Sequence, residues 1–190
     1  MNWILASGSP RRRELLEMLG VPDLTIRPAT GPERATPGAG PEQTVRELSL
    51  HKAQEVAQTC APEDIIIAAD TIVYLDGAIL GKPKDHDDAV RMLTALSGRE
   101  HIVYTGVAVL CGGELRQAAE HTAVRFRTLT PAEIERYIAT GEPMDKAGAY
   151  GIQGRGALFV AHLDGDYFNV MGLPLCRLGQ LLNELGVELL

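Results

Sequence analysis

The stretch that decides the fold is DIIIAADTIVYL, residues 64–75. A run of apolar, mostly β-branched residues predicts a strand buried on both faces, as in the centre of an α/β sheet. The Asp76-Gly77 pair that follows predicts a tight turn at its end. Asp70 is an exception to this pattern, because it places a carboxylate in the middle of the apolar run.

Outward from this strand, strand-like and helix-like segments alternate in both directions, which predicts an α/β fold. Ser9 is expected to cap the first helix, and Gly112-Gly113 to join two long strands. Asp164-Gly165 is expected to join the last two strands as a hairpin. The expected strands are residues 2–6, 101–111, 114–129, 157–163 and 167–171, the helices residues 10–20, 42–59, 87–96, 131–141 and 174–185, and the long loops residues 28–41 and 142–156.

Composition limits the class of protein. The chain has 190 residues and a formal charge of −7, with 45% hydrophobic and 23% charged residues, which excludes disordered and fibrous classes. The acidic balance disfavours nucleic-acid binding, and no apolar run is long enough for a membrane span. Three distant cysteines argue against a disulfide framework or a paired-cysteine metal site. We expect one soluble domain, residues 1–190, in the cytoplasm.

Three consecutive arginines, Arg11, Arg12 and Arg13, fall in the opening turn of the first expected helix. The helix dipole is already positive there, so acidic residues would be more favourable. A solvated basic turn is one interpretation. The other is an anion site, formed by free N–H groups and guanidinium groups next to the small residues Ser7 and Gly8. The strand–loop–helix context favours the anion site, whereas a position in water without a role is the expectation for Arg13.

Two further charged residues interrupt apolar patterns. Lys52 lies between Val45, Leu48 and Val56 on the apolar face of its expected helix. It is either a lysine that extends to the rim of the core or a second phosphate ligand. Asp70 is either a buried, hydrogen-bonded carboxylate or a metal ligand and general base, because burying an unpaired carboxylate costs several kcal/mol.

Residues 145–156, DKAGAYGIQGRG, include four glycines that permit close approach of the backbone to a ligand. This stretch is neither a phosphate-binding P-loop nor a dinucleotide fingerprint. The segment from Gly77 to Pro83 also fails as a P-loop, so kinase chemistry is not expected. The five histidines are scattered, which argues against a histidine-built zinc site.

Four segments carry a family resemblance, namely SGSPRR at residues 7–12, ADTIV at residues 69–73, GKP at residues 81–83 and TGEPMDKAGAYGIQG at residues 140–154. Taken together, these segments resemble the Maf (septum formation protein) family of nucleoside triphosphate pyrophosphatases. The resemblance covers nearly the whole chain, down to Gly172-Leu173-Pro174 near its end.

The resemblance implies an α/β fold like that of the inosine triphosphatase group, with a mixed twisted sheet flanked by helices and two lobes around a cleft. It also implies hydrolysis of a nucleoside triphosphate to the monophosphate and pyrophosphate, a divalent metal, and often a dimer. The form Gly151-Ile152-Gln153-Gly154 is similar to members that prefer dTTP and UTP. Another branch prefers N7-methyl-GTP.

The resemblance also assigns roles to individual residues. Asp70 would be the catalytic base, and Glu33 with Asp70 would hold Mg²⁺ or Mn²⁺, which favour oxygen ligands. Phosphate binding would fall to Ser7, Arg12, Lys52, Lys82 and Lys146, and base choice to Arg11, Thr71 and Gln153. The amide of Gln153 offers one donor and one acceptor, which complement the edge of uracil or thymine.

Two hypotheses of different classes remain. The chain is either a housecleaning enzyme that clears dTTP, UTP or modified pyrimidine triphosphates, or a nucleotide-binding regulator of cell division with little turnover. A methyl-GTP pyrophosphatase would differ from the first only in its base preference. The expected partner is a nucleoside triphosphate, with no nucleic acid and no membrane, and a homodimer is expected from the resemblance.

Overall fold

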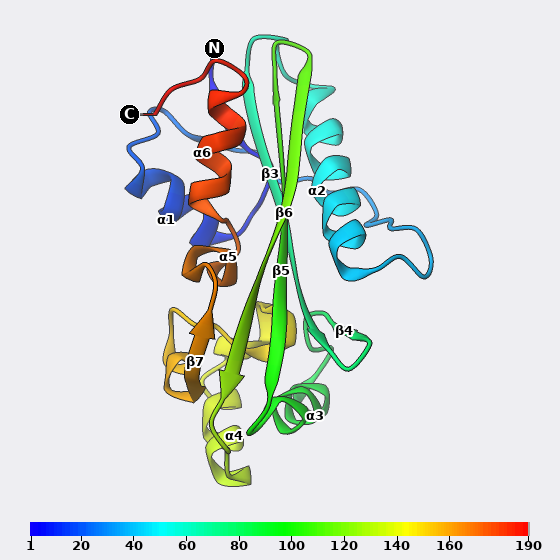
Figure 1. The fold of residues 1–190 in the computed structure, drawn as a ribbon, viewed down its shortest axis with the longest axis vertical. Helices are drawn as coiled ribbons and strands as arrows, with labels where there is room; N and C mark the ends of the chain where they lie inside the picture. The colour runs from blue at the N-terminus through cyan, green and yellow to red at the C-terminus, as the bar shows by residue number, and fades with distance from the viewer. Residues whose placement is uncertain (190) are drawn as a thin grey trace. The chain divides into compact units, whose positions relative to one another are not determined.

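The computed structural model describes residues 1–189 and confirms the α/β class. The strands form one sheet in the order β2-β1-β3-β5-β6-β7, with β4 paired to β3 (Figure 1). The strands are β1 (Trp3–Leu5), β2 (Thr25–Ile26), β3 (Ile65–Leu75), β4 (Ala78–Leu80), β5 (Glu100–Cys111), β6 (Glu114–Phe126) and β7 (Val160–Asp164). The α-helices are α1 (Pro10–Met18), α2 (Pro41–Ala57), α3 (His86–Leu96), α4 (Pro131–Ile138), α5 (Tyr167–Met171) and α6 (Leu175–Asn183).

The sheet is mixed, as the family resemblance implied. Strand β1 pairs in parallel with both β2 and β3, with Ile4 opposite Ile66 in the second pair. Strand β4 pairs antiparallel with β3, and β7 antiparallel with β6. The parallel part of the sheet therefore lies around β1. The β3–β4 hairpin and the β5–β6 hairpin extend the sheet away from it.

The chain divides into two compact units. The first unit contains residues 1–70, 105–120 and 172–190, and the second contains residues 71–104 and 121–171. Three of the four boundaries fall inside β3, β5 and β6, so these strands contribute to both units. No helix within residues 1–189 is long and apolar enough to cross a membrane.

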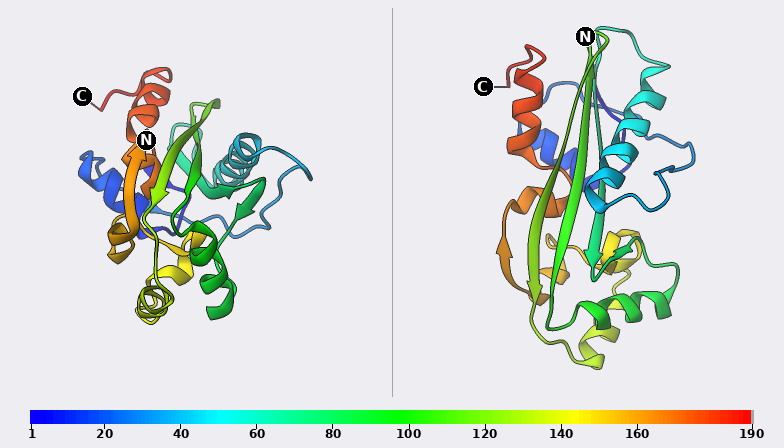
Figure 2. Two further views of the ribbon diagram at one scale, coloured as in Figure 1. Left: turned by 60° about the horizontal axis from the view of Figure 1, so that its bottom comes forward. Right: turned by 45° about the vertical axis from the view of Figure 1, so that its right-hand side comes forward.

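In the first unit, helices cover both faces of the sheet. Helix α2 lies on one face, and α1 and α6 lie on the other (Figures 1 and 2). The alternation of side chains along a strand explains this arrangement. Even-numbered residues of β3, such as Ile66 and Ala68, pack in one cluster with Ala53 and Val56 of α2.

Helix α2 approaches β5 closely at Gly106. A Cβ atom at this position would lie 2.1 Å from the carbonyl oxygen of Val45 and 2.9 Å from the backbone nitrogen of Arg46. Such a distance is far inside van der Waals contact, so only glycine fits here. The glycine thus sets how near α2 lies to the sheet.

Two of the three predicted two-residue turns are confirmed, whereas Asp164-Gly165 lies at the end of β7, before helix α5, and joins no hairpin. Asp76 and Gly77 have φ angles of 49° and 84°, and Leu75 pairs with Ala78 on either side of them. Gly112 and Gly113 have φ angles of 60° and 79° between β5 and β6. Positive φ at both central residues is the signature of the type I′ turn, whose twist suits a hairpin.

The second unit has an aromatic core. The Phe126 ring lies 4.7 Å from the Tyr150 ring and 5.0 Å from the His101 ring, measured between centroids in edge-to-face arrangements. Tyr137 of α4 packs against Phe159 at 4.9 Å. Such aromatic pairs stabilise the fold beyond the contribution of burial alone.

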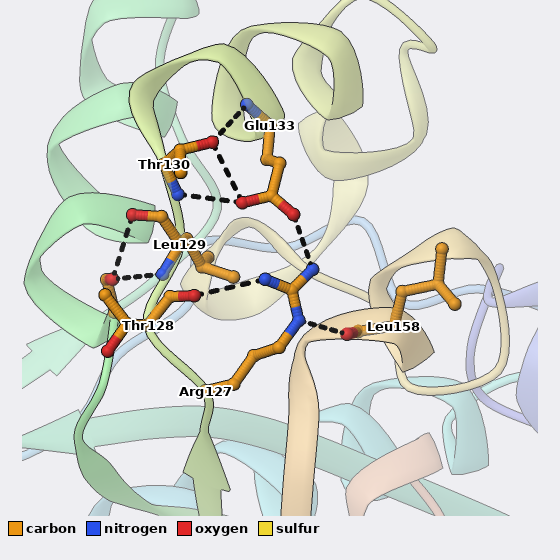
Figure 3. A network of polar contacts seen from close by, with 7 residues as sticks. Arg127, Thr128, Leu129, Thr130, Glu133 and Leu158 are labelled. Carbon is orange, nitrogen blue, oxygen red and sulfur yellow. Dashed lines mark hydrogen bonds and ion pairs between the residues drawn. The ribbon is translucent and has the colours of Figure 1, made fainter.

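Helix α4 begins with a capping box. The Thr130 hydroxyl accepts a bond from the Glu133 N–H, and the Glu133 carboxylate accepts one from the Thr130 N–H (Figure 3). Glu133 also accepts a 2.7 Å bond from Arg127, whose guanidinium donates to the carbonyl of Leu158 (Figure 3). The start of α4 is therefore tied to the segment that leads into β7.

Two local predictions are wrong. Residues 167–171 form helix α5, because the Asp166 carboxylate accepts the Phe168 N–H at 2.8 Å and caps a helix where the apolar pattern predicted a strand. Ser9 stands at the N-cap position of α1, but its side chain makes no capping bond. The Ser7 hydroxyl instead accepts the Ser9 N–H at 3.3 Å.

Candidate active site

Asp70 is positioned by the alternation of β3. It follows Ile66 and Ala68 on the face that α2 covers, so its carboxylate points toward that helix. Its side chain is only 11% exposed. A carboxylate this deeply buried needs a partner of opposite charge.

Lys52 provides this partner. It lies one residue before Ala53, which is part of the α2 face that packs on the sheet, and its ammonium group donates to the Asp70 carboxylate. The same Nζ atom lies 2.7 Å from Oε1 of Glu33. The prediction that Lys52 faces inward is confirmed, and the loop residue Glu33 is brought to the same point. Two carboxylates therefore share one ammonium group, and Lys52 is 19% exposed while Glu33 is 63% exposed.

Arg12 is buried at the start of α1. Its Nη1 donates to the Ser7 hydroxyl at 2.9 Å, and its Nε donates to the Gly172 carbonyl at 2.7 Å. Burial lowers the pKa of Arg12 below its ordinary value, the positive charge of Arg11 lowers it further, and the negative charges of Asp70 and Glu33 oppose this shift. A guanidinium group with such a basic ordinary pKa stays charged, so it forms a fixed positive group near the two carboxylates.

The other two arginines of the turn differ from Arg12. Arg11 is half-buried. Arg13 is exposed and pairs with Glu17 one turn later at 2.6 Å, which matches the solvated role expected for it. Only part of the basic turn therefore faces the interior of the first unit.

Two carboxylates of the first unit, those of Glu33 and Asp70, could hold part of the coordination shell of a divalent metal. Magnesium in nucleotide sites is held by one or two carboxylates, with phosphate oxygens and waters completing the shell. Glu33 and Asp70 provide two carboxylates that already meet at one cation, the Lys52 ammonium. Within residues 1–189, no group of three or more His, Cys, Asp or Glu side chains is arranged to hold a metal. The protein alone would therefore offer only part of a coordination shell.

The remaining predicted residues lie in the second unit. Thr71 is half-buried directly after Asp70, and both Lys82 and Gln153 are exposed. Lys146 is largely buried, and its ammonium group donates to the Glu142 carbonyl at 2.7 Å and to the Asp145 carboxylate at 2.6 Å. Each of these side chains belongs to a unit other than the one that holds Asp70.

The glycine-rich stretch is wrapped around the chain's own side chains. A Cβ atom at Gly154 would lie 2.5 Å from the carboxylate oxygens of Glu142, and one at Gly151 would lie 2.7 Å from Cε of Lys146. A Cβ atom at Gly156 would lie 2.8 Å from the hydroxyl of Tyr137. The close approach that these glycines allow is therefore to side chains of the second unit itself, those of Glu142, Lys146 and Tyr137.

Sequence reasoning missed Glu142, Tyr137 and Gly172. The Gly172 carbonyl gives no signal in a sequence, since any residue carries one. Glu142 does give a signal, because an acidic residue between Gly141 and Pro143 precedes a glycine-rich stretch in which the sequence pattern predicts no helix or strand to pair the backbone N–H groups. A carboxylate beside such a stretch is a natural acceptor for those groups.

A hollow of about 310 Å³ lies on the second unit and contains none of the predicted site residues. It is lined by Arg127, Glu133, Arg136, Tyr137, Thr140, Arg155, Leu158 and Phe159.

Comparison with known proteins decides the family. The profile of the family described as Maf-like protein matches residues 2–185. The chain belongs to the Maf-like protein family. This Maf-like chain is 52% identical to the dTTP/UTP pyrophosphatase of Moorella thermoacetica over 187 residues, which cover 97% of this chain and 95% of that protein.

A second relative is named in the same way. The dTTP/UTP pyrophosphatase of Symbiobacterium thermophilum is 50% identical over 183 residues, which cover 96% of this Maf-like chain and 93% of that protein. Among solved structures, the Ham1 protein of Staphylococcus aureus aligns with 66% of this chain and 72% of its own, at 14% identity and a TM-score of 0.49.

Proposed function

We propose that this chain is a pyrophosphatase that hydrolyses dTTP and UTP to the monophosphate and pyrophosphate. The observation that carries the proposal is the group of Asp70, Lys52 and Glu33, in which a buried carboxylate and a second carboxylate share one ammonium group. The names of relatives at 50–52% identity support the choice of substrate.

In this proposal Asp70 is the general base. Its carboxylate accepts a proton from a water that attacks the α-phosphorus, while Lys52 holds the carboxylate in place. A bond forms between the water oxygen and the α-phosphorus, the bond from that phosphorus to the bridging oxygen breaks, and pyrophosphate leaves with that oxygen. Hydrolysis in ¹⁸O-labelled water should place the label in the monophosphate, and label in the pyrophosphate would contradict this route.

The remaining roles follow the charge of each residue. A triphosphate carries about four negative charges, which basic groups can neutralise locally inside an acidic chain. We infer phosphate binding by Ser7, Arg12, Lys52, Lys82 and Lys146, and base choice by Arg11, Thr71 and Gln153.

Glu33 and Asp70 would hold a divalent metal, Mg²⁺ or Mn²⁺, which neutralises charge on the triphosphate when bound. Removal of metal with a chelator should abolish pyrophosphate release, and Mg²⁺ or Mn²⁺ should restore it. The Glu33→Gln variant should need a metal concentration at least about tenfold higher for half-maximal rate, because it loses one carboxylate ligand. A Glu33→Gln variant with the wild-type metal requirement would remove Glu33 from the metal site.

The experiment that tests the substrate is pyrophosphate release across dTTP, UTP, CTP, the purine triphosphates and N7-methyl-GTP. The proposal predicts the highest kcat/KM for dTTP and UTP. A maximum for N7-methyl-GTP would overturn the assignment of the substrate and keep the reaction. Unchanged preference for dTTP in a Gln153→Glu variant would show that Gln153 does not read the base.

We also infer that the enzyme acts in the cytoplasm as a housecleaning enzyme and forms a homodimer, with no nucleic-acid partner. The acidic charge of −7 supports the last inference, since phosphate backbones favour positive surfaces. Sedimentation of the purified chain tests the dimer directly.

A further inference from the structure

Gln153 lies in a turn that is held at both of its ends. The Gly154 N–H donates to the Gly151 carbonyl at 3.3 Å and closes the turn. The Gly151 N–H donates to the Tyr137 hydroxyl at 3.1 Å. Tyr137 itself is buried in α4 and packs against Phe159, so it is a rigid anchor for the first end of the turn.

The Glu142 carboxylate holds the second end. Its Oε2 accepts the Arg155 N–H at 2.9 Å, and its Oε1 accepts the Gly156 N–H at 3.2 Å. Oε1 also accepts the Tyr137 O–H at 2.8 Å, which joins the two anchors. The absence of a side chain at Gly154 lets the backbone lie directly against this carboxylate.

Glu142 also contacts Lys146 through its backbone. The Lys146 ammonium group donates to the Glu142 carbonyl at 2.7 Å, and the Lys146 side chain lies against Gly151. One residue therefore connects a proposed phosphate ligand with the turn that presents the proposed base-reading residue.

The protonation states suit these roles. Burial favours a higher pKa for Glu142, but the hydrogen bonds from Arg155, Tyr137 and Gly156 outweigh it and hold the pKa below its ordinary value. Burial raises the pKa of Tyr137. At neutral pH Glu142 is therefore an acceptor with no proton, and Tyr137 keeps the proton that it donates.

We propose that Glu142 and Tyr137 are positioning residues that fix the turn of residues 151–154 and thereby set the discrimination between nucleobases without touching the substrate. This inference rests on the proposed function and deepens it, since it concerns the same reaction. Glutamine at position 142 would offer a single oxygen to three donors and turn its NH₂ group toward at least one of them.

The test compares Glu142→Gln and Tyr137→Phe with a matched control, Glu133→Gln. Glu133 lies in the same unit and also accepts several hydrogen bonds, but these end on Thr130 and Arg127 rather than on the turn (Figure 3). The measured quantity is the ratio of kcat/KM for dTTP to that for CTP. We expect Glu142→Gln to lower this ratio at least about fivefold, mainly through a higher KM for dTTP, and Glu133→Gln to keep it within about twofold.

Amide hydrogen exchange provides a readout that does not depend on turnover. Exchange at Arg155 and Gly156 should become faster in Glu142→Gln and stay unchanged in Glu133→Gln, because only the first change leaves a single oxygen for the three donors that two oxygens serve in the wild type. Faster exchange with an unchanged nucleotide ratio would overturn the inference and leave the proposed function intact. Unchanged exchange would overturn it as well. A wild-type chain without dTTP hydrolysis would instead overturn the proposed function.

Discussion

Lys52 is the residue on which the charge balance of the first unit depends. It separates two carboxylates, of which Asp70 is buried and cannot be compensated by water. Its charge in an apolar helical pattern made it predictable from the sequence, as did that of Asp70 in an apolar strand. The fact that Glu33 reaches the same ammonium group could not be predicted in this way, since it lies in a loop without periodicity.

Replacement of Lys52 should therefore destabilise the fold. We expect Lys52→Met to lower the free energy of unfolding by about 2–4 kcal/mol, because it leaves the Asp70 carboxylate buried without a counter-charge. The double variant Lys52→Met/Asp70→Asn should recover much of this loss. Arg13→Met is the control, since loss of the exposed pair with Glu17 should cost less than about 1 kcal/mol. Chemical denaturation measures all three, and a double variant less stable than Lys52→Met would contradict this account.

His101 makes stability depend on pH. Its ring is buried, Nε2 lies 2.8 Å from the Tyr150 hydroxyl, and Nδ1 has no partner within residues 1–189. Burial lowers the pKa of His101 to about 4, against about 6.5 in an unfolded chain. Between these values the unfolded state binds more protons, so stability is complete above about pH 6.5 and falls as the pH decreases toward 4.

We expect wild-type stability to decrease by up to about 3 kcal/mol over this window, and His101→Gln to show a flatter profile. The exposed residue His86 acts in the opposite direction, because carboxylates raise its pKa and its contribution is lost as the pH rises. Carboxylates with lowered pKa values lose their contribution only below about pH 4.5. Between pH 7 and 5, His86 contributes equally to both proteins, so the difference in slope between the wild type and His101→Gln reports His101. Equal slopes in the two proteins would rule out His101 as the cause.

At the scale of elements, the sequence predicts a turn correctly where a residue type favours the backbone angles that the turn needs. The turns at Asp76-Gly77 and Gly112-Gly113 were predicted because their positive φ angles favour these residues. The sequence pattern does not predict helix α5, because its N-cap, Asp166, follows Gly165, a residue typical of a hairpin turn. Local capping outweighed the apolar pattern of the five residues Tyr167–Met171.

The contact between α2 and β5 yields a prediction about packing. Gly106→Ala should lower the free energy of unfolding by about 1–3 kcal/mol or more, because the new methyl group would overlap the Val45 carbonyl and force the helix away. Gly179→Ala in α6 is the matched control. A Cβ atom there meets nothing within 4 Å, so this change should stabilise the helix by about 0.5–1 kcal/mol. A Gly106→Ala protein as stable as the wild type would show that α2 can move at little cost.

At the scale of the whole molecule, the alternation of segments predicted the α/β class but not the order of the strands. The parallel pairs of β1 join strands that are far apart in the sequence, and no local pattern reports such pairs. The division of β3, β5 and β6 between two units could not be predicted from the sequence either, because each has the residue pattern of one continuous strand. The sequence likewise marks Glu142 as an acceptor but not its partners, because Arg155 and Gly156 lie 13 and 14 residues away.

The most direct test of the central claim is pyrophosphate release from dTTP by the wild type and by Asp70→Asn, with dTTP binding to both measured by calorimetry. We predict that the variant binds dTTP within about tenfold of the wild-type affinity and releases pyrophosphate at least about 100-fold more slowly, because it lacks the general base. A wild type that binds dTTP without releasing pyrophosphate would favour a nucleotide-binding regulator. An Asp70→Asn variant that keeps the wild-type rate would contradict the assignment of Asp70 as the base.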